Sequence, residues 1–186
     1  MVLENRIAGF RAGMNELMPN VTLPPVVETK PDRSGNFVVW NQAIQANRDA
    51  LGYADACESG QQNIAKIIED DDMSAVTVAF DGPEEIRDAV RRGFVLAASP
   101  SNHYLQGYIA VLLASKAIHE GKELPQGWAK LPVTIVDSSN IENFIEAWKT
   151  PAPGLRAFFE EDVNDVLDAV AKGNFAETGA YDLPPL

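Results

Sequence analysis

The chain has 186 residues, and its 15 lysines and arginines against 27 aspartates and glutamates give a formal net charge of −12. This charge repels phosphate backbones and anionic headgroups, so no nucleic-acid partner is expected and an anionic membrane surface is disfavoured. Apolar residues make up 46% and charged residues 23%, which is typical of a folded chain rather than a disordered one. The length suits one globular domain or two small lobes.

Cysteine and histidine are too scarce for an internal disulfide or a zinc-like cluster. Cys57 is the single cysteine, and His103 and His119 are the two histidines. We therefore expect no metal site and no cofactor. No apolar stretch approaches the ~18 residues that a membrane-spanning helix needs. Residues 1–10 lack the basic and apolar regions of a signal peptide, so none is expected within this sequence, which says nothing of a precursor.

The first quarter of the chain alternates helical and strand-like patterns. Apolar residues at helical spacing predict a helix over 3–18. The run 23–28 is β-prone and opens with prolines, and a second helical pattern covers 35–47. A short strand is expected near 50–54.

The next part of the chain holds the clearest strand. Ser59 with Gln62 resembles a capping box and predicts a helix start. Residues 76–80 are β-branched and apolar on both faces, as in a buried parallel strand. The segment 81–85 is typical of a helix start, with a proline in the first turn and acids at the positive end of the dipole. Residues 94–99 form another expected strand.

A long helix over 102–120 follows and is expected to stop at Gly121. The last strand is predicted over 132–136. Ser139 with Glu142 is a second capping-box pattern, and it opens a further helix.

Pro151 and Pro153 are expected to break the chain before a final amphipathic helix over 155–170. We therefore divide the sequence into an α/β ligand-binding lobe over 1–150 and a C-terminal helix and tail over 151–186. Five short strands separated by helices favour an α/β fold with a mostly parallel sheet flanked by helices.

Polar side chains follow the predicted strands. Asp55 comes after the strand near 50–54, Asp81 directly follows Phe80, and Ser101 and Asn102 follow the strand that ends at 99. Ligands of parallel sheets bind beyond the carboxyl ends of the strands, and a carboxylate can accept paired hydrogen bonds from vicinal hydroxyls. The pattern favours a polyhydroxyl ligand. The alternative, equally open, is that such a residue caps the next helix.

The segment 76–121 resembles the type I periplasmic sugar-binding proteins of ABC transporters, in the manner of the ribose-binding protein. The family has a strand ending in Phe-Asp, then a short helix ending in Arg-Gly, then a Ser-Pro turn, and then a helix with a glycine near its start. This sequence has the same features in the same order, at Phe80-Asp81, Arg92-Gly93, Ser99-Pro100 and Gly107. The flanking runs RIAGFRAGM and LPVTIVDSSNIENF agree with it.

The resemblance implies a ligand site. Asp81 matches the family's aspartate that holds sugar hydroxyls, and Asp55 matches an acid in a second ligand stretch. Ser101 lies where many members carry a sugar-binding glutamine. Glu4 lies where some members have a ligand-binding arginine, so that contact is not implied, and Arg6 is interpreted as a packing residue. No catalytic residue is implied.

The resemblance also implies partners and a location. Members have two lobes in nearly twice this length, and this chain resembles the C-terminal portion. A missing N-terminal lobe, a membrane permease and a sugar-like ligand are the implied partners, and the periplasm is the implied location. The helix over 102–120 packs on the first lobe in the family. Without that lobe, its apolar stripe is expected to pair with a second copy. The alternatives are that the helix folds back over the chain's own sheet or that the segment from Leu155 onward covers the stripe. The stripe comprises Leu105, Tyr108, Ile109, Leu112 and Leu113.

Two other functions stay open. The first is a ligand-sensing domain of a transcription regulator, which would use the same fold. The second is a small α/β sugar-modifying enzyme, with Cys57 as nucleophile and His103 as base.

Overall fold

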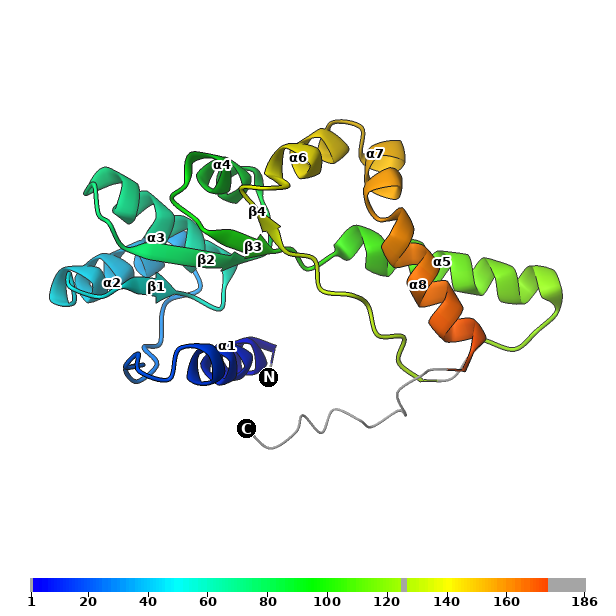
Figure 1. The fold of residues 1–186 in the computed structure, drawn as a ribbon, viewed down its shortest axis with the longest axis horizontal. Coiled ribbons are helices and arrows are strands. Elements are labelled where there is room, and N and C mark those ends of the chain that lie inside the picture. The colour runs from blue at the N-terminus through cyan, green and yellow to red at the C-terminus, as the bar shows by residue number, and fades with distance from the viewer. Residues whose placement is uncertain (1, 125–126, 174–186) are drawn as a thin grey trace. The chain divides into compact units, whose positions relative to one another are not determined.

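A computed structural model describes residues 2–124 and 127–173 (Figure 1). In its described part the chain divides into two compact units, of which the first comprises residues 2–99 with Ile135–Ser139 and the second comprises residues 100–124, 127–134 and 140–173. Between residues 2 and 173 the chain thus crosses from one unit to the other after Ser99, after Thr134 and after Ser139. The domain boundary expected at residue 150 stays a prediction.

The first unit is built on a four-stranded sheet with the order β1-β2-β3-β4. These strands are β1 (Gly52–Ala54), β2 (Val76–Phe80), β3 (Ala97–Ser99) and β4 (Val136–Asp137). β1 and β3 both pair with β2 in parallel, and β4 pairs with β3 in the antiparallel direction. The prediction of an α/β fold with a mostly parallel sheet is confirmed.

Four helices belong to this unit: α1 (Val2–Leu17), α2 (Arg33–Ala46), α3 (Glu58–Asp70) and α4 (Glu84–Arg92). Helix α3 packs on β1 and β2, and α2 packs on α3. Figure 1 shows α1 on the side of the sheet opposite α3. The core between α2 and α3 consists of fully buried isoleucines, each contributing about 1.5–3 kcal/mol of hydrophobic free energy: Ile44, Ile64, Ile67 and Ile68.

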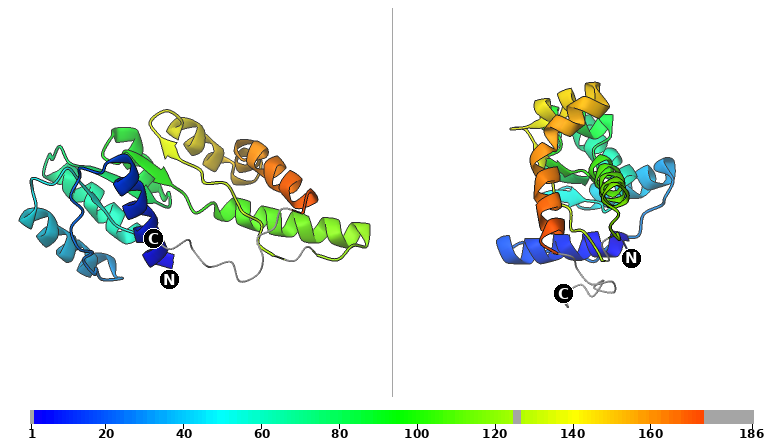
Figure 2. Two further views of the ribbon diagram at one scale, coloured as in Figure 1. Left: turned by 60° about the horizontal axis from the view of Figure 1, so that its bottom comes forward. Right: turned by 90° about the vertical axis from the view of Figure 1, so that its right-hand side faces the viewer.

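The second unit is helical in its described part. It contains α5 (His103–Glu120), α6 (Ile141–Lys149), α7 (Pro151–Phe158) and α8 (Glu160–Ala171). Aromatic rings join the helices, since Phe144 of α6 meets Phe158 of α7 edge-on at 5.4 Å between ring centroids. Both views in Figure 2 show α5 and α8 side by side.

The chain's own C-terminal helices cover part of the apolar stripe on α5. The side chains of Leu105 and Ile109 are buried, and the Tyr104 ring stacks on Phe159 with 6.2 Å between centroids. Of the arrangements expected for the stripe, cover by the segment from Leu155 onward is therefore the one seen at Leu105 and Ile109. A homodimer stays a prediction, and its surface would be the exposed side of α5, where Val111 is 71% exposed.

Several local expectations were wrong. The β-prone run 23–28 is no strand, because its two adjacent prolines lack the N–H groups that a ladder needs. Pro151 begins α7 instead of breaking the chain, since a proline at the first helical position removes no intrahelical hydrogen bond. The helix expected over 155–170 is consequently two helices, which meet at Phe159.

The two capping boxes were also misplaced. The N-cap of α3 is Cys57 rather than Ser59, and the N-cap of α6 is Asn140 rather than Ser139. Ser139 instead donates its hydroxyl and its backbone N–H to Oδ1 of Asp137.

No helix within residues 2–124 and 127–173 combines the length and the apolar content that crossing a membrane would require.

Candidate ligand-binding site

Asp81 lies at the carboxyl end of β2 in a conformation that few residues adopt. Its φ of +75° falls in the left-handed region, which costs free energy for a residue with a Cβ. Its backbone N–H donates to the carbonyl of Ser99 at 2.9 Å, and this hydrogen bond fixes the turn at the end of the sheet. The N-cap of α4 is Pro83, so Asp81 does not cap that helix. The capping alternative for Asp81 is thereby removed.

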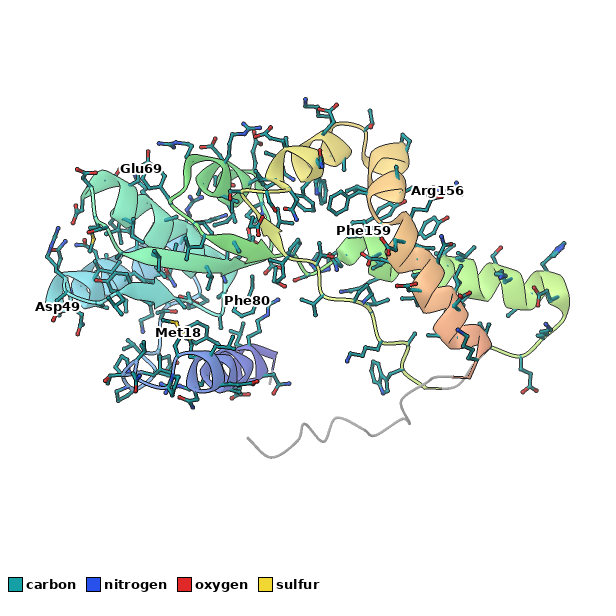
Figure 3. The ribbon with its side chains drawn as sticks, in the orientation of Figure 1. Met18, Asp49, Glu69, Phe80, Arg156 and Phe159 are labelled. Carbon is teal, nitrogen blue, oxygen red and sulfur yellow. The ribbon has the colours of Figure 1, made fainter. Side chains whose placement is uncertain are left out.

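Arg6 of α1 approaches this carboxylate from a different element. Its Nη1 lies 3.3 Å from Asp81 Oδ2 and donates to the backbone carbonyl of Ala56 at 3.0 Å. Its guanidinium lies 5.0 Å from the ring centroid of Phe80. Figure 3 shows Phe80 between the end of β2 and α1. Arg6 therefore connects the segments that follow β1 and β2.

The Arg6–Asp81 pair is within reach of solvent, since the two side chains are 24% and 20% exposed. A pair of this exposure contributes on the order of 1 kcal/mol or less to stability. It combines donor and acceptor groups at the carboxyl edge of parallel strands, where a hydroxyl can both donate to a carboxylate and accept from a guanidinium. The interpretation of Arg6 as a packing residue did not include its contact with Asp81, because the helix pattern of α1 does not show which strand ends it meets.

Asp55 also lies at this edge, directly after β1, but its carboxylate is engaged within the protein. Oδ2 accepts a 2.6 Å hydrogen bond from Trp40 Nε1 and a 3.5 Å contact from the hydroxyl of Thr29. Oδ1 accepts from the backbone N–H of Cys57 at 2.7 Å. Asp55 is 9% exposed. Through these hydrogen bonds, Asp55 connects α2 to the turn between β1 and α3.

The first turn of α3 closes around Asp55. A Cβ at Gly60 would collide with the Asp55 carboxylate, so only glycine fits beside it in this arrangement. The side-chain amide of Gln61 donates to the Asp55 carbonyl at 2.8 Å. The turn held in this way includes the Ala56 carbonyl that receives Arg6. Asp55 and Arg6 thus contact the same turn between β1 and α3.

Ser101 and Asn102 belong to the second unit. Asn102 is 8% exposed, and its Nδ2 donates to the carbonyl of Pro132 at 3.2 Å and to Oγ1 of Thr134 at 2.9 Å. The carbonyl of Ser101 accepts a 2.5 Å hydrogen bond from Nε2 of Gln106. The structure therefore brings Asp55 and Asp81 to one sheet edge and places Ser101 and Asn102 at the start of α5. A ligand-binding role for all four stays a prediction.

A hollow of about 470 Å³ lies elsewhere in the first unit, along α1. Its lining is mostly apolar but includes Glu4, Arg11 and Asn15, and neither Asp55 nor Asp81 lines it. We do not assign the ligand to this hollow, because none of the residues that follow the strands lines it. Within residues 2–124 and 127–173, no cluster of three or more His, Cys, Asp or Glu side chains could hold a metal ion.

Cys57 is the N-cap of α3 and is partly buried. The hydroxyl of Ser59 approaches its Sγ at 3.7 Å. In the part of the chain that the structure describes, no hydrogen bond joins Cys57 to a histidine.

The fold is that of one part of the solute-binding proteins of ABC transporters. A periplasmic ribose ABC transporter protein from Conexibacter woesei superimposes with a TM-score of 0.66 at 19% identity, over 78% of this chain and 50% of that chain. A solute-binding protein from Agrobacterium vitis, bound with α-D-tagatopyranose, superimposes with a TM-score of 0.63 at 21% identity, over 75% of this chain and 46% of that chain. A sugar-binding protein from Bacillus halodurans superimposes with a TM-score of 0.59 at 20% identity, over 75% of this chain and 51% of that chain.

The chain thus spans about half the length of these structures. No protein-family model matches it, and no curated protein does. The likeness shows the fold.

Proposed function

We propose that this chain is the C-terminal portion of the substrate-binding component of an ABC importer, with a sugar or a similar polyhydroxyl molecule as its ligand. Asp81 accepts hydrogen bonds from ligand hydroxyls, and Arg6 donates to a hydroxyl or ring oxygen beside it. Ser101 contributes its hydroxyl from the start of α5. Asp55 and Asn102 support the site, because their side chains are already engaged within the protein.

The Arg6–Asp81 pair is the observation that carries this proposal. A carboxylate in a left-handed conformation stands at the end of a parallel strand, where ligands of such sheets bind, and it meets an arginine from another element. Such a conformation is maintained where function requires it. The solved structures that share the fold include one bound with a sugar, which supports the same ligand class.

The remaining parts of the proposal follow from the clamshell design of such receptors. An N-terminal lobe supplies the second wall of the site, a membrane permease receives the loaded receptor, and the protein works in the periplasm. One wall leaves a bound sugar hydrated on its other side, so the hydroxyl contacts mostly exchange with water. We therefore expect this chain alone to bind weakly, with a dissociation constant of about 1 mM or above.

Two-dimensional NMR with D-ribose, D-arabinose and D-tagatose as probes tests the proposal, because NMR detects millimolar binding. At least one sugar is expected to shift the amide signals around Asp81 and the side-chain signals of Arg6. D81A should abolish the shifts. D49N, which changes an exposed carboxylate in a turn, should retain them. No shift with any of the three sugars, or equal shifts in D81A, would overturn the ligand assignment.

Calorimetry on the same chain tests the half-receptor part separately. Sub-micromolar binding would show that one lobe suffices and would overturn that part alone. A sensing domain of a transcription regulator would bind ligand through the same residues, and a basic DNA-binding segment upstream in the full protein would identify it. An enzyme would require Cys57, and C57S would abolish turnover.

A further inference from the structure

We infer that Asn102 is a positioning residue that holds two of the three connections between the units together, so that these two connections bend as one. The proposal concerns the relative motion of the units and stands apart from the identity of the ligand. We call the two hydrogen bonds from Asn102 Nδ2, to the Pro132 carbonyl and to Thr134 Oγ1, the Asn102 bridge.

The two connections are already paired on the side of the first unit. β3 ends at Ser99, immediately before the first crossing, and β4 begins at Val136, just after the second. Because the antiparallel register sets Ala98 opposite Val136, the chain leaves β3 and enters β4 at the same end of the sheet (Figure 1).

The Asn102 bridge repeats this pairing on the side of the second unit. Asn102 lies three residues after the first crossing, and Thr134 is the last residue before the second crossing, so the bridge joins the two connections close to their ends. Ladder bonds on one side and the bridge on the other close a ring that contains both connections. Two chains held at both ends bend together, whereas two independent chains would let the units twist and slide as well.

The chemistry of position 102 fits asparagine for two separate reasons. Its φ of 49° is in the left-handed region, which asparagine tolerates better than most residues with a Cβ. Because the Pro132 carbonyl can only accept, the amide nitrogen must face it. The side chain is 8% exposed, and its Oδ1 is buried without a partner among the described residues, which is an unfavourable arrangement. The two hydrogen bonds that Nδ2 donates must therefore offset the cost of burying this side chain.

Variants can separate these two reasons. N102G removes the bridge and relieves the backbone, whereas N102A removes the bridge and retains the backbone cost. T134V removes one acceptor with little change of shape. Q106A is the matched control, because it removes a neighbouring hydrogen bond to the Ser101 carbonyl that joins no two connections.

The readout is the distance distribution between two nitroxide spin labels, measured by electron–electron double resonance in the full chain. Labels are placed through Gln42→Cys in α2 and Ile118→Cys in α5, both exposed, in a Cys57→Ser background. We expect a narrow distribution that broadens in N102A and N102G, broadens less in T134V and is unchanged in Q106A.

Three outcomes would overturn the inference. A wild-type-like distance distribution in N102G would show that position 102 matters only through its backbone conformation and that the hydrogen bonds of the side chain do not restrict the units. Equal broadening in Q106A would show a general effect on α5. A broad distribution in the unsubstituted chain would show that the bridge does not restrict the units. If N102A fails to fold, T134V still decides, because hydrogen exchange at the Thr134 amide should accelerate in it while α8 stays protected.

Discussion

The indole Nε1 of Trp40 lies 2.6 Å from Oδ2 of Asp55, so that a partly buried hydrogen bond to a carboxylate joins α2 to the end of β1. Hydrogen bonds of this kind are worth more than neutral ones, and leaving one partner buried without the other costs more than the bond contributes. The bond engages the Asp55 carboxylate within the protein, and a ligand-binding role for Asp55 stays a prediction. Substitutions at Asp55 and at the residues around it can therefore test how much these hydrogen bonds stabilise the fold.

The first test replaces Asp55 with asparagine. If the amide oxygen keeps the Cys57 N–H, the amide nitrogen must face the indole N–H of Trp40, and two donors then oppose each other. We expect a loss of about 1–3 kcal/mol in the free energy of unfolding, measured with urea. The control, D49N, changes a carboxylate in an exposed turn (Figure 3) and should change the free energy by less than about 0.5 kcal/mol. Equal stability of D55N and the unsubstituted chain would contradict the structural role of Asp55.

A second test compares two glycines in helices of the first unit. An added Cβ at Gly60 would collide with Asp55, whereas one at Gly13 would meet nothing within 4 Å. We expect G60A to lose about 1–3 kcal/mol through overpacking. G13A should gain about 0.5–1 kcal/mol, because alanine is the better helix former. A gain in both variants would show that the turn around Asp55 relaxes freely.

The sequence predicts those parts of the fold whose patterns are local. Val76–Phe80 was predicted as a buried strand, and the structure has it as β2, because β-branched residues on both faces fit few other environments. The strand expected over 132–136 shrinks to Val136–Asp137, since its length depends on how far β3 runs beside it. Such a partner is not visible in the strand's own residues.

The candidate site divides in the same way. Asp81 could be found, because it directly follows a recognisable strand. Arg6 could not be assigned to the site, since its contacts with Asp81 and Ala56 join residues 75 and 50 positions apart. The engagement of Asp55 likewise depends on Trp40 in a separate helix, and no spacing rule connects the two. Long-range contacts, rather than residue types, decided which carboxylate is accessible.

In the second unit, the packing of α5 predicts a contrast between two of its side chains. Leu105 is fully buried, whereas Val111 is 71% exposed. L105A should lose about 2–5 kcal/mol, because it leaves a cavity in the interior. V111A should stay within about 0.5 kcal/mol of the unsubstituted chain. Thermal unfolding followed by circular dichroism checks both values, and a small effect of L105A would show that α8 does not cover α5 in solution.

The exposed side of α5 also carries the prediction of a homodimer. Light scattering coupled to size exclusion should show a mass above 20.2 kDa at high concentration if Val111 and Ile118 pair with a second copy. I118E should then return the chain to a monomer, because it places a charge in the apolar contact. A monomer at every concentration in the unsubstituted chain would exclude pairing through this surface.

The last prediction concerns acid. The hydroxyl of Ser139, and then its backbone N–H, donate to Asp137 and hold the pKa of that carboxyl below its ordinary value. A carboxyl whose pKa is lower in the folded state stabilises the fold above its unfolded pKa, and this contribution disappears as the pH falls through the folded value. S139A should raise the pKa of Asp137, followed by carboxyl carbon NMR. It should destabilise the chain at pH 7, and the difference should disappear once the pH has fallen below the folded pKa of Asp137. S138A changes the exposed neighbouring serine and should leave both quantities unchanged. A stability difference between S139A and the unsubstituted chain that persists with Asp137 fully protonated would show that the hydroxyl acts independently of the carboxylate charge.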